Sequence, residues 1–595
     1  MRHPAPQPAH LPLAVCVLPT SPGGRNRWNE HPAYIHEILA HAGLAYEAVA
    51  FDQLGDRLER VGLLVTVGET AAPEFCEALA DWIRRGGAWL GLGGLCGLSD
   101  ELGLEPVPPA FSMTPPDIPG TLGEGYLSPL DPEHPVLAHL RIPLHFFNGL
   151  PVLARDSVVL ANVLDAHQHA TVRPALVEGA VGEGLALFLA ADLTGAVVRI
   201  QQGLTIAHNG VPAPDGTGGL PNDLLRVHDG VVLDWIFDRQ LVEGEPGLSA
   251  FLEPVADQWR ELLLRAIFYL AAGRGLHLPL CWYYPRGAPA LAELSLDTDG
   301  NEPEKATGLL DLLHMRDIRA TWHTLLPGYP GKLPARIARQ GHELAMHYNA
   351  TDHEGGQWSE AVFREQFTRL TELFAGRPPI SNKNHNLRWE GDTAFFEWCD
   401  RTGVRLDQTK GPSDVGEAGF LFGTCHPYRP VEVRSGRRFE VFELPTLTQD
   451  LEVFAPITLL EPLVTAVVRN HGILHLLFHP EHLAFNADVL AETLAWTRAQ
   501  GLEWWTAAAI DRWERARRAV RWTPSVCEGG RAAVRWVTPA ALGGATLLWL
   551  APEKARIKID GRVHATTPVR RYGFRFESVV FDAQAGAAYE LELIP

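Results

Sequence analysis

Apolar runs and helical patterns alternate along the first third of the chain. Short apolar runs have the length of buried strands, and they lie at residues 13–18, 63–67, 88–92 and 184–191. Helical spacing of apolar positions separates them at 32–40 and 72–85. Alternating strands and helices with short links predict a parallel, doubly wound α/β sheet.

A second alternation begins near residue 290 and continues to about residue 520. Its strand candidates are 293–296, 320–325, 343–347, 380–384, 404–407, 440–444 and 473–478. Helical patterns lie between several of them, including 359–374, 394–402 and 459–470. Seven or so such units predict a complete or slightly open (β/α) barrel.

The remaining segments differ from these two regions in composition and in the pattern of apolar positions. Residues 193–246 are rich in Gly, Pro and Asp, and 255–272 form an amphipathic helix pattern. Short strand patterns after residue 520 predict a small all-β, sandwich-like module. The predicted domains are therefore an N-terminal α/β domain, an irregular linker with a helix, the barrel and the β module, at 1–215, 216–290, 291–520 and 521–595.

Composition narrows the possible partners. The chain has 51 Lys and Arg against 71 Asp and Glu, a net charge of −20, which repels nucleic acid and anionic membranes. We therefore expect a neutral or cationic substrate, with neither nucleic acid nor membrane as partner. Seven cysteines without a CxxC pair, no secretory signal and no apolar run of about 18 residues favour the cytoplasm. The oligomeric state is left open.

Polar residues gather where the first barrel strand ends. Asp297 and Asp299 follow the apolar strand with only Thr298 between them. In a barrel, side chains at the carboxyl ends of the strands line the active site. One carboxylate could bind a metal while the other accepts a proton from water. The alternative is a polar turn, because Asp299-Gly300-Asn301 is good turn chemistry.

The third and seventh barrel strands each end in a histidine. His347 and His342 are five residues apart on a strand pattern, which excludes the HExxH helix of zinc proteases. His347 lies at the strand end, where a metal ligand belongs. His479 follows the seventh strand and precedes Pro480, and the near-neutral pKa of histidine suits it to general-acid chemistry.

The fourth strand ends in a run of polar residues, 382–389. An apolar core does not tolerate so many polar groups without partners, so we expect them to line a polar cavity. Lys383, Arg388 and Trp389 are the substrate-binding candidates, and the tryptophan could stack on a sugar ring. Plain packing is the alternative for Trp389.

The barrel resembles the polysaccharide deacetylase (NodB-homology) superfamily in a divergent, bacterial form. Segments 295–300, 320–323, 341–347 and 473–479 are similar to its motifs, and together they span about 225 residues. The resemblance implies a metal-dependent deacetylase in which Asp297 is the general base and His479 protonates the leaving amine. Asp299 and His347 would bind a divalent metal, which in this family is usually zinc.

The sequence departs from the family at several positions. Four residues after His347, where a second metal histidine is usual, stands Thr351. The substitute ligand is either His353 or His385. The resemblance implies a substrate with an N-acetyl group, either a carbohydrate or a related small amide.

The N-terminal region resembles the class I glutamine amidotransferase-like superfamily, which has a flavodoxin-like fold. Gly94-Leu95-Cys96-Gly97 is similar to its nucleophile turn, but Leu98 replaces the last glycine. No His-x-Glu follows within this region, so we expect it to be non-catalytic. Two rival functions remain: a glutamine amidotransferase that uses Cys96, and a carbohydrate-binding scaffold without activity.

Overall fold

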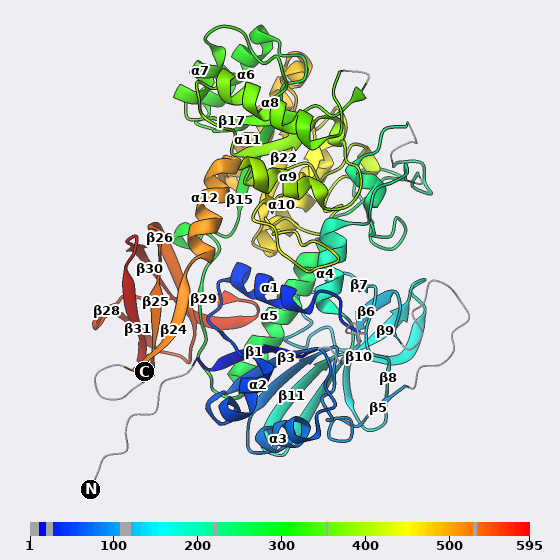
Figure 1. The fold of residues 1–595 in the computed structure, drawn as a ribbon, viewed down its shortest axis with the longest axis vertical. Coiled ribbons are helices and arrows are strands. Elements are labelled where there is room, and N and C mark those ends of the chain that lie inside the picture. The colour runs from blue at the N-terminus through cyan, green and yellow to red at the C-terminus, as the bar shows by residue number, and fades with distance from the viewer. Residues whose placement is uncertain are drawn as a thin grey trace. The chain divides into compact units, whose positions relative to one another are not determined.

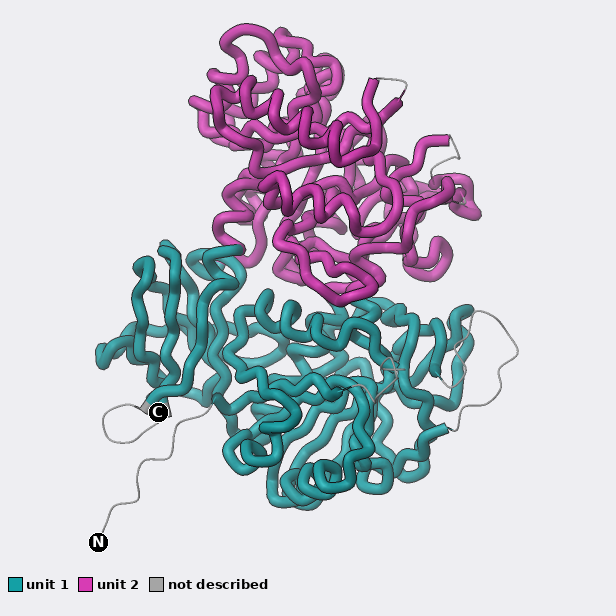
Figure 2. The backbone as a smooth tube through the Cα atoms, in the orientation of Figure 1, with its two compact units in different colours: residues 1–197, 258–287, 515–595 teal, residues 198–257, 288–514 magenta. Residues whose placement is uncertain are grey.

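The computed structural model describes residues 11–19, 28–107, 121–210, 212–218, 223–352, 355–526 and 532–594. These residues form two compact units (Figure 2). Unit 1 comprises 1–197, 258–287 and 515–595, and unit 2 comprises 198–257 and 288–514. The units are discontinuous in sequence and do not follow the boundaries at 215, 290 and 520, so the four sequence-based domains remain a prediction.

A nine-stranded sheet forms the α/β part of unit 1 (Figure 1). In sheet order its strands are β2 (Glu47–Ala48), β1 (Leu13–Val17), β3 (Leu63–Val67), β4 (Ala88–Leu92), β11 (Gly184–Leu189), β10 (Ala170–Val181), β9 (Val158–Asp165), β6 (Gly125–Pro129) and β7 (Leu144–Phe146). The first five strands are parallel, in the flavodoxin-like order. The predicted doubly wound sheet is thus confirmed, and four antiparallel strands extend it.

Helix α3 (Pro73–Arg84) shows how the sequence builds this core. Phe75, Leu79 and Ile83 recur at helical spacing and are buried together with Trp89 of β4. Each such side chain contributes about 1.5–3 kcal/mol through burial. The chain turns after the helix at Gly86, whose φ of 108° favours glycine.

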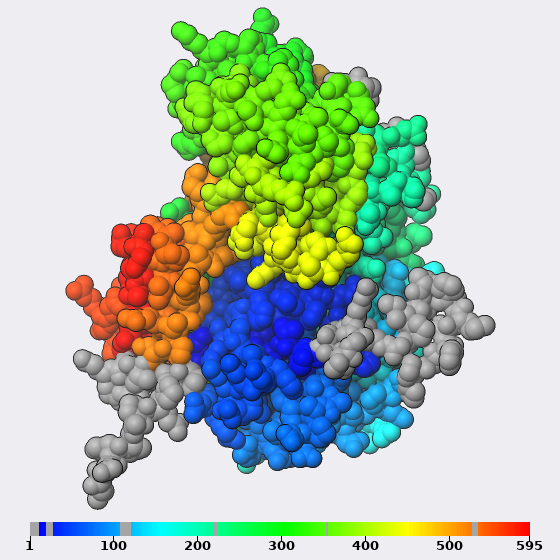
Figure 3. Space-filling view, in the orientation of Figure 1, coloured from blue at the N-terminus to red at the C-terminus, as the bar shows by residue number. Residues whose placement is uncertain are grey.

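Two antiparallel sheets near the C-terminus form another part of unit 1, which appears as an orange-to-red lobe beside the blue N-terminal part (Figure 3). One sheet has the order β14 (Pro279–Cys281), β26 (Leu542–Leu550), β30 (Phe574–Ala583) and β29 (Thr567–Arg571). The other has the order β24 (Arg521–Val526), β25 (Ala532–Val537), β31 (Ala588–Ile594), β27 (Arg556–Ile559) and β28 (Arg562–His564). The predicted all-β module is present, and β14 joins it from the middle of the chain after helix α5 (Val255–Gly273).

Unit 2 is built on a parallel sheet that curves into an open barrel. Its strand order is β20 (Phe442–Glu443), β19 (Leu406–Asp407), β18 (Ser381–Asn384), β17 (Glu343–Tyr348), β16 (Thr321–Thr324), β15 (Leu291–Asp297), β22 (Ile473–Phe478) and β21 (Thr448–Gln449), with β23 (Glu503–Trp505) also paired to β15. Every described pair is parallel. The prediction was a complete or slightly open (β/α) barrel, and the described strands form an open one.

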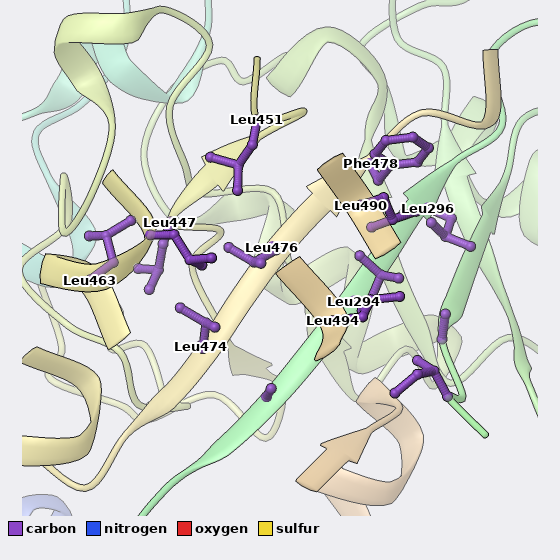
Figure 4. Packing of buried hydrophobic residues seen from close by; sticks show 14 of the residues in the cluster. Leu294, Leu296, Leu447, Leu451, Leu463, Leu474, Leu476, Phe478, Leu490 and Leu494 are labelled. Atoms are coloured by element: carbon purple, nitrogen blue, oxygen red, sulfur yellow. The ribbon is translucent and has the colours of Figure 1, made fainter. Parts of the chain in front are cut away.

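Alternation along the barrel strands separates the core from the site. Leu294 and Leu296 of β15 belong to a buried apolar cluster with Leu474 and Leu476 of β22, which Figure 4 shows at close range. Successive side chains of a strand point to opposite faces. The intervening residues, among them Ser295, therefore face the barrel interior, and this is how an apolar strand delivers polar groups to one end of the barrel.

Helices cover the barrel strands. They are α6 (Pro303–Met315), α7 (Leu333–Arg339), α8 (Glu360–Leu373), α9 (Ala394–Thr402), α10 (Leu460–Arg469) and α11 (Leu483–Ala499). Leu490 and Leu494 of α11 pack into the apolar cluster (Figure 4). Among the helices of the described residues, none combines the length and the apolar character that crossing a bilayer requires.

Candidate metal centre and active site

Three potential metal ligands meet at the carboxyl ends of neighbouring barrel strands. Asp299 lies two residues after β15, His347 is the penultimate residue of β17, and His385 directly follows β18. Parallel strands bring their carboxyl ends to one edge, so residues up to 86 positions apart converge. Their ligand atoms lie within 4.8 Å of one another.

The spacing of these atoms suits a small divalent cation. His347 Nε2 is 3.2 Å from Asp299 Oδ1 and 3.3 Å from His385 Nδ1, and His385 Nδ1 is 3.4 Å from Asp299 Oδ1. Tetrahedral ligands at zinc bond lengths of about 2.0–2.1 Å are about 3.3–3.4 Å apart. The triangle therefore has the size of three ligands around one cation, and His385 is the candidate for the third position that lies within the described residues.

The surroundings fix the orientation of two of these ligands. His347 Nδ1 lies 2.9 Å from the carbonyl oxygen of Lys383, an arrangement in which Nδ1 donates and Nε2 is left for the cation. Burial alone would raise the pKa of Asp299, but its contacts with the rings of His347 and His385 hold the pKa well below its usual range. Asp299 is therefore a carboxylate, the form that binds a metal.

His479 lies beside this triangle. Its Nε2 is 3.7 Å from Asp299 Oδ2, and its Nδ1 hydrogen-bonds to the buried Asp450 carboxylate, which also accepts the His479 backbone N–H at 2.9 Å. Burial would lower the pKa of His479, but the bond to Asp450 and the nearby carboxylates raise it to about 9. His479 thus carries a proton at neutral pH and can donate it.

Asp297 occupies the interior side of the site and is 3% exposed. Its Oδ2 is 3.8 Å from His347 Nε2, while its Oδ1 is 3.5 Å from both Lys383 Nζ and His323 Nδ1. Within the described residues, Oδ1 makes no hydrogen bond. The carboxylate therefore lies next to the ligands, with Oδ2 toward His347 and Oδ1 toward Lys383 and His323.

A polar network fills the barrel interior below Asp297. Lys383 Nζ donates to Ser295 Oγ at 2.7 Å, and the same hydroxyl lies 2.9 Å from His475 Nε2. His475 Nε2 is also 2.8 Å from the Glu293 carboxylate. His475 is thus a buried partner of the network inside the strand, and Lys383 is a fully buried cation under Asp297.

The other sequence candidates are placed differently. Arg388 donates to the carbonyl oxygen of Leu225 and pairs with Glu390. Trp389 is 2% exposed and packs against Phe395 and Phe396. The substrate-binding role of both residues stays a prediction, but the tryptophan ring is covered by protein. His353 lies outside the described residues.

Sequence reasoning missed Asp450 and His482. Asp450 comes one residue after β21, a strand of two residues with no periodic signal. It is fully buried, and its Oδ1 lies 3.0 Å from His482 Nδ1. The sequence contained one signal for these residues. His479 and His482 flank Pro480-Glu481, and two histidines so close together indicate a nearby acidic partner.

Cys96 of unit 1 lies in a strained turn after β4. Its φ of 49° is uncommon for a residue other than glycine. Burial, followed by the charge of Glu69, raises the pKa of its thiol well above the usual value. The backbone N–H groups of Leu95 and Cys96 donate to the Glu69 carboxylate at 2.6 and 2.9 Å. A carboxylate therefore occupies the donors that could otherwise stabilise an oxyanion.

Neither a protein-family model nor a curated relative matches the chain. Among solved structures, a proposed polysaccharide deacetylase from Mycobacterium smegmatis is 20% identical over 41% of this chain and 96% of its own, with a TM-score of 0.30. A proposed polysaccharide deacetylase involved in O-antigen biosynthesis from Bordetella bronchiseptica is 21% identical over 39% of this chain and 86% of its own, with a TM-score of 0.25.

A β-galactosidase from Bacillus circulans sp. alkalophilus is 12% identical over 31% of this chain, which spans 29% of that enzyme, with a TM-score of 0.23. None of these three similarities supports an amidotransferase-like N-terminal region. Similarities this weak carry no argument about activity, so the function has to be inferred from the geometry of the site itself.

Proposed function

We propose that unit 2 is a metal-dependent hydrolase that removes N-acetyl groups from a carbohydrate or a related amide. One observation carries the proposal: Asp299, His347 and His385 present three ligand atoms at mutual distances of 3.2–3.4 Å. A proton acceptor and a proton donor adjoin this triangle. Amide hydrolysis needs both, because water loses a proton and the leaving amine gains one.

Two histidines and one carboxylate are a ligand set that zinc takes in catalytic sites, where a further position stays open. We therefore expect zinc. When bound, such a cation polarises the amide carbonyl and lowers the pKa of water. The chain would hold it with an ionised Asp299 and with a His347 ring that the Lys383 carbonyl orients.

The proton transfers fall to Asp297 and His479. Asp297 accepts a proton from the water whose oxygen attacks the acetyl carbon, and Lys383 stabilises the charge of the carboxylate beforehand. His479 gives its proton to the amide nitrogen as the carbon–nitrogen bond breaks. Asp450 then stabilises the imidazole in the orientation needed for the next cycle. The products are acetate and a free amine.

Acetate release tests the proposal. The zinc-loaded protein should release acetate from N-acetylglucosamine oligomers, and Asp297→Asn and His479→Ala should each lower the rate by about 10²–10⁴-fold without loss of zinc. His314→Ala is the matched control, because this exposed histidine of α6 is outside the site. Zinc binding without acetate release from any N-acetylated substrate would contradict the deacetylase, and absence of bound metal would favour the scaffold.

A further inference from the structure

Exposed aromatic rings are rare in this protein. Within the described part of the chain, Phe454 and Phe485 are the only Phe, Tyr or Trp side chains that are largely exposed, at 42% and 69%. Large apolar side chains left in water often mark a surface that a ligand covers. Their location therefore matters more than their number.

Both rings belong to one cluster with the histidines of the site. The Phe454 ring is 6.3 Å from the ring of His479 and 5.8 Å from that of His482, centroid to centroid. The Phe485 ring is 5.5 Å from His482, and the two histidine rings are 5.3 Å apart. The two exposed aromatic side chains of unit 2 thus continue directly from the residue that we assign as proton donor.

The backbone around these rings is part of well-formed elements. Phe454 lies between β21 and the short helix Ile457–Leu459, and Phe485 is the third residue of α11. The Phe454 backbone N–H donates to the carbonyl oxygen of Asp450 at 3.0 Å. The residue that orients His479 therefore also fixes the start of the segment that carries Phe454.

We propose that Phe454 and Phe485 form a platform for the amine-bearing ring of the substrate, a neutral N-acetylated aminosugar. This inference rests on the proposed deacetylase function. His479 protonates the leaving nitrogen, so the substrate group next to His479 is the one that carries the amine and not the acetyl group. A pyranose ring has a flat face of C–H groups that can lie on an aromatic ring.

The chemistry around the platform fits this occupant. His482 lies between the two phenylalanines and offers an imidazole to ring hydroxyls. The ring of Trp389, the other candidate for stacking, is covered by Phe395 and Phe396. The platform thus selects a cyclic aminosugar over an acyclic amide.

Binding to a variant that cannot turn over its ligand tests the platform. We would measure the Kd of the β-1,4-linked trimer of N-acetylglucosamine by calorimetry on zinc-loaded, full-length Asp297→Asn protein. Adding Phe485→Ala or Phe454→Ala should weaken binding by about 5- to 10-fold each, because an aromatic contact contributes about 1 kcal/mol. Phe485→Tyr should retain the affinity.

The controls separate stacking from unspecific effects. Met315→Ala, which removes another exposed apolar side chain of unit 2, should leave the Kd unchanged. N-acetylethanolamine, an acyclic amide, should bind equally to all variants. An unchanged Kd for the trimer in both alanine variants, or no binding of the trimer at all, would overturn the platform. Platform-dependent binding without acetate release by the unmutated protein would instead overturn the deacetylase and leave the platform intact.

Discussion

The parallel strands of unit 1 and those of unit 2 are followed by polar residues that make different contacts. At the carboxyl edge of the barrel in unit 2, Asp299, His347 and His385 turn their polar atoms toward one another. At the corresponding edge in unit 1, carboxylates turn to the backbone instead. Glu69 accepts the N–H groups of Leu95 and Cys96, and Asp192 accepts that of Gly195 at 2.9 Å.

This difference shows what makes a strand edge reactive. Parallel topology brings polar side chains to one edge in both sheets. Among the described residues at these two edges, those of unit 2 direct their polar atoms toward one another, because contacts such as that of His347 with the Lys383 carbonyl orient them. In unit 1 the carboxylates of Glu69 and Asp192 instead accept hydrogen bonds from the backbone of turns. Burial also raises the pKa of Asp192 to about 7.

Removing one of the proposed metal ligands of unit 2 should produce the largest effect. It is the most direct test of whether the strand ends of unit 2 differ from those of unit 1 by binding a metal. We expect Asp299→Ala and His347→Ala to lose bound zinc and to reduce acetate release by roughly 10³-fold or more. Elemental analysis of the purified protein measures the metal. His314→Ala should keep about one zinc per chain. Full zinc occupancy in both ligand variants would show that the metal binds elsewhere.

Removing the partner of His479 should have the next largest effect. Asp450→Asn keeps the size of the side chain but removes the charge that raises the pKa of His479. A general acid works only while protonated, so activity falls as pH rises through its pKa. We expect a loss of about 10²–10⁴-fold at pH 8 and an alkaline limb shifted to lower pH.

The pH–rate profile of Asp450→Asn distinguishes this role from a general loss of folding. Asp317→Asn is the matched control, since that carboxylate is exposed and pairs with Arg319 at 3.7 Å. The Asp317→Asn variant should leave the alkaline limb of the pH–rate profile at the same pH as in the unmutated protein. An alkaline limb that does not move in Asp450→Asn would rule out His479 as the acid that Asp450 supports.

Removing the buried cation tests how the interior of the barrel is stabilised. Lys383→Met leaves Asp297 buried without its cationic partner, which should lower the free energy of unfolding by about 3–5 kcal/mol. Urea unfolding measures the change. Lys305→Met, at a partly exposed lysine that pairs with Glu302, should change it by less than about 0.5 kcal/mol. Equal effects of the two substitutions would argue against the interior ion pair.

The smallest effect is expected in unit 1. Cys96→Ala should leave acetate release unchanged, because the buried thiol has a raised pKa and its turn is filled by Glu69. In the folded protein Cys96 should also resist iodoacetamide, which mass spectrometry of the digested protein detects. Rapid alkylation of Cys96 would support the alternative function as a glutamine amidotransferase. Glutamine hydrolysis that is present in the unmutated protein and lost in Cys96→Ala would support it as well.

The polar residues at the strand ends of the barrel could be predicted from sequence, because the pattern that marks them lies within a few consecutive residues. Asp297, Asp299, His347 and His479 each follow an apolar run, and the structure brings all four to one place. Asp450 gave no such signal, since its strand has two residues and its importance comes from its contact with His479.

Other features depend on contacts that no local pattern encodes. Trp389 stands in a polar stretch but is buried by aromatic residues of α9. The antiparallel strands of unit 1 lack a clean alternation: β10 changes from exposed to buried within its twelve residues. Strand β14 pairs with β26 more than 260 positions later, a contact that only the folded chain reveals.

Lys383 serves both halves of the site through different atoms. Its carbonyl oxygen meets the ring of His347, and its ammonium group lies under Asp297. A single residue of the sheet would thus position both a cation bound to His347 and a water molecule activated by Asp297. Side-chain substitutions there could tune the basicity of Asp297 while the ligand geometry stays constant, which gives evolution and protein engineers an adjustment of reactivity separate from metal affinity.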